Sequence, residues 1–257
     1  MKALASLALF AALGSAAFAQ TIFSTGFDAP TYTAGATVVG QDGWAIGSGS
    51  GSYQTVSNAV SFAGGQSLTF APAGGSSFAS VIRSFTSVAN TAYTLSTKIR
   101  IAGTTSVDRT FGLYLSTTTL GNTYLGATIS GAGGLRVGKT WSDTYKTTAD
   151  ATAAAGTFAD RWLDLVLKLD GAGNGTVAFS GFSDGAVYNY SFTGVTNTSG
   201  TKYVNVGTDY LATTASPGTG SFDNLSLVST TPVPEPATMA ILGLGAAALL
   251  RRKRRSA

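Results

Sequence analysis

The sequence predicts an all-β protein built as a two-sheet sandwich, and two observations support this prediction. Apolar and polar residues alternate in many short segments, as they do in strands that bury one face. Clusters of glycine separate these segments at short intervals, and the chain has 33 Gly in 257 residues. No part of the body has a convincing helical period, so we expect essentially no helix between residues 21 and 230. Residues 149–155 are the one stretch that suits a single helical turn.

The individual strands follow from the alternation. Residues 93–101 and 162–170 show it most clearly, with aromatic and branched residues on one face and charged residues on the other. A dozen short segments of this kind are typical of two packed sheets. The expected strands are 53–56, 59–62, 67–70, 78–85, 93–101, 111–115, 124–130, 135–141, 162–170, 187–192, 203–206 and 222–228.

The N-terminal residues have the three parts of a secretory signal peptide. Lys2 supplies the positive charge, an apolar stretch follows, and an A-x-A cleavage pattern ends at Ala19. Cleavage there would leave Gln20 as the first residue of the mature chain. We therefore expect the Sec translocon and signal peptidase as partners, and a retained N-terminal anchor is the alternative.

Three signals follow one another at the C-terminal end. The first is Pro234-Glu235-Pro236, the second is an apolar stretch over residues 237–250, and the third is a basic cluster. The apolar stretch would form a transmembrane helix of roughly 21 Å, shorter than the ~30 Å hydrocarbon core. Such a helix suits a transient stop in the membrane, and an ordinary C-terminal anchor is the alternative. The basic cluster, expected to stay in the cytoplasm, consists of Arg251, Arg252, Lys253, Arg254 and Arg255.

This order of a Pro-Glu-Pro motif, a Gly/Ala/Leu helix and an Arg-rich end resembles the PEP-CTERM sorting signal of Gram-negative bacteria. The resemblance implies recognition by exosortase, a membrane-embedded cysteine transpeptidase. It also implies cleavage near the motif, after a transient stay in the inner membrane, and delivery to the cell surface or the extracellular matrix. We thus expect a signal peptide over 1–19, a β-sandwich domain over 20–230 and a sorting signal over 231–257.

The charge of the body differs from that of the whole chain. Six of the sixteen Lys and Arg residues lie in the two targeting segments, so the net charge of +4 belongs to those segments. The body has ten Lys and Arg against eleven Asp, without a basic patch. Nucleic acid is therefore not an expected partner.

The residue types that the chain lacks exclude several chemistries. There is no His and no Cys, and Glu235 in the sorting motif is the only Glu. Ser-His-Asp and Cys-His catalysis and the usual zinc sites are thereby excluded. A glycosidase would need a pair of Asp residues instead of the usual Glu. We therefore expect no enzyme, and no cofactor beyond a structural calcium ion.

The body has a second resemblance. Gly26-Phe27-Asp28, the turn at 40–44, the hairpin at 167–176 and Phe222-Asp223-Asn224-Leu225 resemble the concanavalin-A-like lectin/glucanase jelly rolls. The resemblance implies a jelly-roll-like sandwich. The Glu-based catalytic motif of the glucanases in that family has no counterpart in this body.

Two groups of oxygen-bearing residues are candidates for calcium. Asp28 and Asp223 lie near the two ends of the body, and the first and last strands of a jelly roll often pair. The two carboxylates are therefore candidates for sharing a structural Ca²⁺, with turn capping as the alternative. The segment from Asp170 to Asn174 resembles half of an EF-hand loop, but a hairpin turn is the better interpretation.

Aromatic residues are candidates for contact with sugars. Trp141 and Tyr145 lie in a polar stretch that favours an exposed glycan platform, although ordinary packing is the alternative. Trp44 and Trp162 are expected in the core or as a lid. Three functions stay open: a non-enzymatic surface or matrix protein with exopolysaccharide as its candidate ligand, a matrix protein without a ligand, and an Asp-based glycan hydrolase or lyase.

Overall fold

The computed structural model describes residues 17–49, 53–72, 79–104, 106–117, 123–140, 148–154, 156–195, 197–210 and 217–232. These residues form strands, turns and bends without a helix, which confirms the predicted all-β fold. Residues 21–229 make one compact unit. No helix long and apolar enough to cross a membrane occurs in the described parts of the chain.

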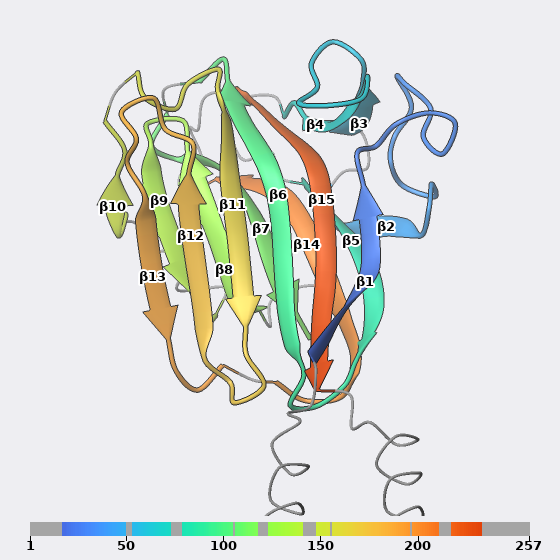
Figure 1. The fold of residues 1–257 in the computed structure, drawn as a ribbon. Helices are drawn as coiled ribbons and strands as arrows, with labels where there is room; N and C mark the ends of the chain where they lie inside the picture. The colour runs from blue at the N-terminus through green and yellow to red at the C-terminus, as the bar shows by residue number, and fades with distance from the viewer. Residues whose placement is uncertain are drawn as a thin grey trace, which may run out of the picture. The chain divides into compact units, whose positions relative to one another are not determined.

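Two antiparallel sheets face each other (Figure 1). Sheet A consists of β1 (Ala17–Thr25), β3 (Gln54–Ser57), β4 (Ser67–Phe70), β6 (Ala92–Ala102), β11 (Trp162–Leu169), β12 (Gly175–Ser180), β13 (Tyr188–Phe192) and β15 (Thr219–Pro232). Sheet B consists of β2 (Trp44–Gly49), β5 (Ala79–Ser87), β7 (Arg109–Ser116), β8 (Thr123–Ser130), β9 (Gly134–Gly138), β10 (Ala151–Thr152) and β14 (Gly200–Tyr210). The strand orders are β13-β12-β11-β6-β15-β4-β3, with β1 against β15, and β10-β9-β8-β7-β14-β5-β2.

The core lies between the sheets and is supplied by alternate residues of each strand. In β11 the four leucines are buried, and the residues between them are half-buried or exposed. Leu167 stands opposite Leu95 of β6, and both belong to one apolar cluster with residues of sheet B. The alternation predicted for these two strands therefore has its physical cause in this shared core.

We expect Leu167→Ala to lower the free energy of unfolding by about 2–5 kcal/mol, because it leaves a cavity in a fully buried layer. The adjacent Lys168 is exposed, so Lys168→Ala should change it by about 0.5 kcal/mol or less. Urea denaturation of both variants checks the prediction. Equal losses in the two variants would contradict the assignment of the faces.

The structure corrects several sequence-based predictions. Residues 59–62 are not a strand but part of the loop between β3 and β4, because backbone amides of this loop bind a carboxylate instead of a neighbouring strand. The described part of the stretch 149–155, residues 149–154, does not form a helical turn. Ala151 and Thr152 pair with β9 instead, so sheet pairing overrides the helix propensity of alanine. The strand expected over 135–141 ends at Gly138. The strands β1, β2 and β10 were not predicted, and β12 was expected only as the second strand of the hairpin around 170–175, without bounds.

The ends of the described chain lie side by side, because β1 pairs with β15 (Figure 1). Ala19 and Gln20, on either side of the expected signal cleavage, are exposed residues of β1. The Pro-Glu-Pro motif, the apolar stretch and the basic cluster lie outside the described residues.

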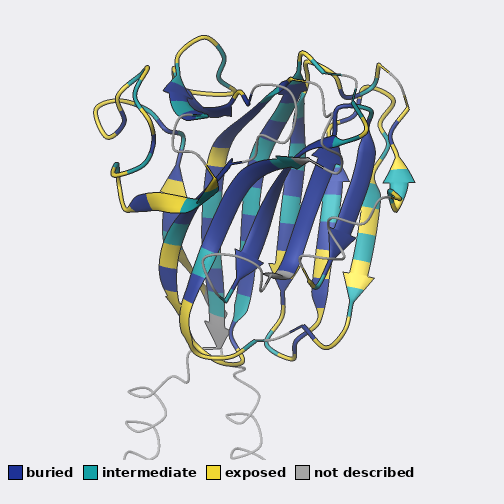
Figure 2. Cartoon of the chain, turned by 180° about the vertical axis from the view of Figure 1, so that it is seen from behind, coloured by how far each residue is buried: buried dark blue, intermediate teal, exposed yellow. Residues whose placement is uncertain are grey.

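The outward faces of the two sheets differ in burial. In β6 and β11 of sheet A, the outward residues are half-buried or exposed. In β7 and β9 of sheet B, every residue is buried, so the face that points away from sheet A is buried as well (Figure 2). This outward face of sheet B, called the B face below, is the first candidate for a functional site.

Candidate functional site

The B face is polar and has several positions without a side chain. Strand register places its residues in rows across five strands, from β5 through β14, β7 and β8 to β9. One row consists of Ser80, Gly207, Gly112, Thr128 and Arg136. The next row consists of Ile82, Asn205, Tyr114, Gly126 and Gly138.

The adjacent glycines at the centre of the B face have a packing reason. A Cβ at Gly207 would lie 2.8 Å from the carbonyl oxygen of Ala79, and a Cβ at Gly112 would lie 2.4 Å from that of Ala127. Neither position accepts a side chain without a shift of the neighbouring strand. The floor of the face is therefore bare backbone flanked by hydroxyl, amide and guanidinium groups.

Three polar atoms on the B face are buried without a hydrogen-bond partner, namely Ser80 Oγ, Thr110 Oγ1 and Asn205 Oδ1. Thr110 is 0% exposed and Asn205 is 2% exposed. Thr110 belongs to this face because it alternates with the core residue Phe111 and pairs with Asp209 of β14. A buried polar group without a partner costs about 1–3 kcal/mol. Because these atoms have almost no accessible surface, a polar ligand would reach them only if the residues that cover them moved aside.

Arg136 adds a buried positive charge at the β9 end of the face. Its burial lowers the pKa of the guanidinium group, and the negative charges of Asp108 and Asp150 oppose that shift. The guanidinium also donates to the carbonyl oxygen of Val107, at 3.4 Å. The face therefore combines hydroxyl and amide groups with the guanidinium of Arg136 and the carboxylate of Asp209.

A second candidate is the group formed by Asp28, Asp223 and Asn224. All three point toward Gly26, which has no side chain. A Cβ at Gly26 would lie 2.8 Å from Asp28 Oδ2, 3.5 Å from Asp223 Oδ1 and 3.7 Å from Asn224 Oδ1. The structure thus brings together the two aspartates that the sequence placed at opposite ends of the body. Asn224 adopts φ 47°, a left-handed conformation that asparagine tolerates.

Asp223 is fully buried, and backbone amides hold its carboxyl group. Its Oδ2 accepts the amides of Phe62 and Ala63 at 2.7 and 3.1 Å, and its Oδ1 accepts that of Asn224 at 2.7 Å. Burial raises the pKa of Asp223, the three amides lower it, and the charge of Asp28 raises it further. None of the ion pairs found among the described residues involves Asp28 or Asp223.

This group fits an oxygen-loving cation. Two carboxylates and an amide oxygen face a space that a methyl group would fill, and calcium prefers such ligands. No cluster of three or more His, Cys, Asp or Glu side chains suited to a metal occurs in the described parts of the chain. A cation at Gly26 would need further ligands from backbone carbonyl groups or water.

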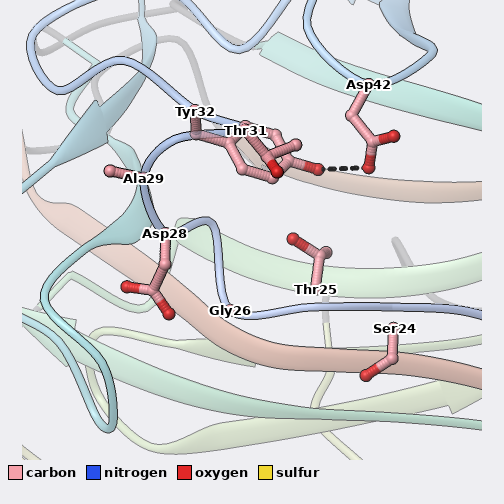
Figure 3. A pocket seen from close by; sticks show the side chains of 8 residues that line it. All are labelled: Ser24, Thr25, Gly26, Asp28, Ala29, Thr31, Tyr32 and Asp42. Carbon is pink, nitrogen blue, oxygen red and sulfur yellow. Dashed lines mark hydrogen bonds between the residues drawn. The ribbon is translucent and has the colours of Figure 1, made fainter.

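A polar pocket of about 310 Å³ adjoins this group (Figure 3). The Tyr32 hydroxyl donates to Asp42 Oδ2 at 2.8 Å, as Figure 3 shows, and Asp42 also forms an ion pair with Arg83. Burial raises the pKa of Tyr32. Because these partners satisfy Asp42, the pocket offers hydroxyl groups and charge but no free acid–base pair.

Two further aspartates are engaged in an ion pair and in a turn. Asp164 pairs with Lys98 at 2.6 Å, and the two lie on the outward face of sheet A. Asp170 accepts the amides of Ala172 and Asn174, which lowers its pKa. Residues 170–174 therefore form a hairpin turn, which the sequence analysis favoured over an EF-hand loop.

The tryptophans occupy different environments. Trp44 is 2% exposed and packs against Phe27 in the core, as expected. Trp162 is half-buried on the outward face of sheet A, where its ring meets Phe62. Sequence reasoning missed this contact because it assigned Phe62 to a strand. Trp141 and Tyr145, the predicted glycan platform, lie outside the described residues.

The chain matches the PEP-CTERM protein-sorting motif over residues 232–255. This match confirms the prediction for the C-terminal end. The motif implies export, recognition by exosortase and sorting to the cell envelope or surface. No curated protein matches the sequence significantly.

Solved structures with the same fold support the predicted jelly-roll-like sandwich. The lectin from Bauhinia forficata in complex with GalNAc is 11% identical, with a TM-score of 0.53 over 84% of this chain and 100% of the lectin. The CBM2 module of the evolved Dit of Lactobacillus casei BL23 phage J-1 is 8% identical, with a TM-score of 0.54 over 83% of this chain and 97% of the module. A carbohydrate esterase of bacteriophage phi24B is 13% identical, with a TM-score of 0.52 over 83% of this chain and 100% of the esterase. At these identities the similarity shows the fold alone.

Proposed function

We propose that this protein is a non-enzymatic glycan-binding protein of the bacterial surface or extracellular matrix. Its signal peptide directs it to the Sec translocon, and signal peptidase cleaves between Ala19 and Gln20. Exosortase then removes the tail after a transient stay in the inner membrane of a Gram-negative cell. The sandwich binds exopolysaccharide through the B face.

The observation that carries the proposal is the set of partnerless polar atoms on the B face. Ser80, Thr110 and Asn205 present buried hydroxyl and amide oxygens beside bare glycine backbone. Ligand sites commonly place a few polar groups in a buried surface, where they fix the orientation of the ligand. A polyhydroxylated chain supplies the partners that these atoms lack. The lectin and the CBM2 module of the same fold add support for a glycan as the ligand class.

The state of the aspartates supports the absence of catalysis. A general acid must keep its proton near neutral pH and reach the substrate. Asp223 has a raised pKa, but its side chain is fully buried on backbone amides and does not reach a substrate. Asp160 and Asp164 are engaged in ion pairs with Arg100 and Lys98.

Asp28, Asp223 and Asn224 are proposed to hold a structural calcium ion. The ion would neutralise two carboxylates that otherwise face each other without a cation. It would contribute to stability and not to chemistry at the B face.

Thr110→Val tests the B face. The valine replaces a partnerless hydroxyl with a methyl group, so the unliganded protein should become as stable as wild type or more stable, by up to about 1–3 kcal/mol. Binding of the host's exopolysaccharide should weaken about tenfold, because a hydrogen bond to the ligand is lost. Chemical denaturation and isothermal titration calorimetry measure the two effects.

Thr97→Val is the matched control for this test. Thr97 is equally buried, but its hydroxyl donates to the carbonyl oxygen of Asp223 at 2.9 Å. The control should lose about 1 kcal/mol of stability and keep its affinity. A Thr110→Val variant that is less stable than wild type and binds as well would contradict the role of the B face.

A further inference from the structure

An exposed aromatic pair lies on the outward face of sheet A, on the other sheet from the B face. Phe62 is 45% exposed, and its ring centroid is 6.1 Å from that of Trp162, with an interplanar angle of 73°. Lys98 Nζ lies 4.4 Å from the Phe62 centroid. We propose that Phe62 and Trp162 form a second glycan-binding site, specific for a neutral sugar ring. Phe62 and Trp162 are called the platform below.

Two carboxylates hold the loop that carries Phe62 by accepting its backbone amides. Asp223 accepts the amides of Phe62 and Ala63, and Asp28 Oδ1 accepts those of Gly65 and Gln66 at 2.8 and 3.1 Å. The exposed ring therefore stands on an ordered backbone. A ring that is already in place loses little conformational entropy when a ligand stacks on it.

The surroundings of the platform suit a sugar better than a protein partner. A stable protein interface buries about 800 Å² on each side around an apolar centre. The platform is a single ring pair on a sheet face that is otherwise mostly polar. A pyranose has an apolar C–H side and a rim of hydroxyl groups, so it matches an aromatic ring with hydrogen-bonding neighbours. The neighbouring outward residues of β6 and β11 are Thr94, Ser96, Lys98, Arg100, Asp164, Val166 and Lys168.

The charges around the platform favour a neutral ring. Lys98 pairs with Asp164 at 2.6 Å, and Arg100 pairs with Asp160 at 2.8 Å. Lys98 and Arg100 each have their own carboxylate, so these two cations leave no net positive charge beside the ring pair for a uronic acid. The carboxylate side chains are 41% and 66% exposed and can accept hydrogen bonds from sugar hydroxyls.

The platform is separate from the B face, so it stands without the proposed function of that face. If both sites bind, one molecule can hold two polymer chains, one at each sheet. Such bivalent binding would strengthen attachment to a matrix beyond the affinity of either site.

Calorimetric titration of the purified exported protein tests the platform. The probes are oligosaccharides of glucose, galactose and mannose, and oligogalacturonate of equal length. Phe62→Ala should weaken binding of a neutral oligosaccharide about tenfold, because the stacking ring is lost. Trp162→Phe keeps an aromatic ring and should retain most of the affinity. Val187→Ala removes another exposed apolar side chain, 57% exposed, and should have no effect.

Each outcome decides the proposal. Unchanged affinity in Phe62→Ala, with a wild-type circular dichroism spectrum and Tm, overturns it, and so does binding of oligogalacturonate alone. Loss of affinity in Thr110→Val but not in Phe62→Ala also contradicts binding at the platform and supports binding at the B face. Loss in Phe62→Ala but not in Thr110→Val supports the platform and contradicts the B face. If the wild-type protein binds none of the neutral oligosaccharides, the proposal for the platform is wrong, even if the protein binds its host's exopolysaccharide.

Discussion

Asp223→Ala should lower the free energy of unfolding by about 2–4 kcal/mol, measured by urea denaturation. The change removes the acceptor of three backbone amides, those of Phe62, Ala63 and Asn224, and a buried donor without a partner is costly. Relief of the repulsion with Asp28 offsets part of the loss. The loop between β3 and β4 should also open, which faster amide hydrogen exchange at residues 60–66 would report.

Asp184→Ala is the matched control for Asp223. Asp184 is exposed and accepts a single amide, that of Ala186 at 3.0 Å, so its loss should cost about 0.5–1 kcal/mol or less. Added calcium should raise the Tm of the wild type and of Asp184→Ala, but not that of Asp223→Ala. A calcium response that survives in Asp223→Ala would contradict the cation site at Gly26.

Deletion of residues 233–257 should abolish retention at the cell envelope in a host that has exosortase. The sorting motif matches residues 232–255, so the deletion removes nearly all of the recognised segment while every strand of the two sheets is kept. Immunoblots of envelope and medium fractions measure the effect, and the truncated protein should be recovered from the medium.

Glu235→Ala separates recognition of the motif from loss of the apolar stretch. Glu235→Ala should reduce retention at the cell envelope, as the deletion does. Lys168→Ala in the body should leave sorting unchanged. Mass spectrometry of the mature surface protein provides a further check. A mature protein that still contains Arg251–Arg255 would contradict removal of the tail and support an ordinary anchor.

Local alternation predicted much of the fold. It identified β6 and β11 because apolar residues occupy nearly every second position in them, and burial alternates in the same way. It gave no bounds for β12, which starts at a glycine and carries small residues, and it missed β10, whose two residues pair only with β9. It assigned 59–62 to a strand because local pattern cannot report that Asp223, 161 residues from Phe62, binds the amide of that residue.

The B face was not predictable from alternation. In residues 109–116 the polar positions look like a solvent-exposed face, yet Thr110 and Tyr114 are buried. The available signal was the placement of Gly112, Gly126 and Gly207 within strands, since glycine in a strand often marks a close backbone approach. Only strand pairing shows that Gly112 and Gly207 are neighbours.

The proximity of Asp28 and Asp223 was predicted because the first and last strands of such sandwiches often pair. The platform was not predicted. It depends on the loop between β3 and β4, which brings Phe62 to Trp162 on β11 of sheet A. Contacts of this kind join segments about 100 residues apart, and no local pattern encodes them.

Incubation of the purified exported protein with its host's exopolysaccharide tests the proposed function most directly, with bound protein and released reducing ends measured in the same sample. We expect saturable binding that weakens in Thr110→Val, with no reducing ends above those of the polysaccharide alone. Absence of binding would contradict a glycan-binding function. Release of reducing ends that a single Asp→Asn change abolishes would contradict the absence of catalysis and identify an Asp-based glycan hydrolase or lyase.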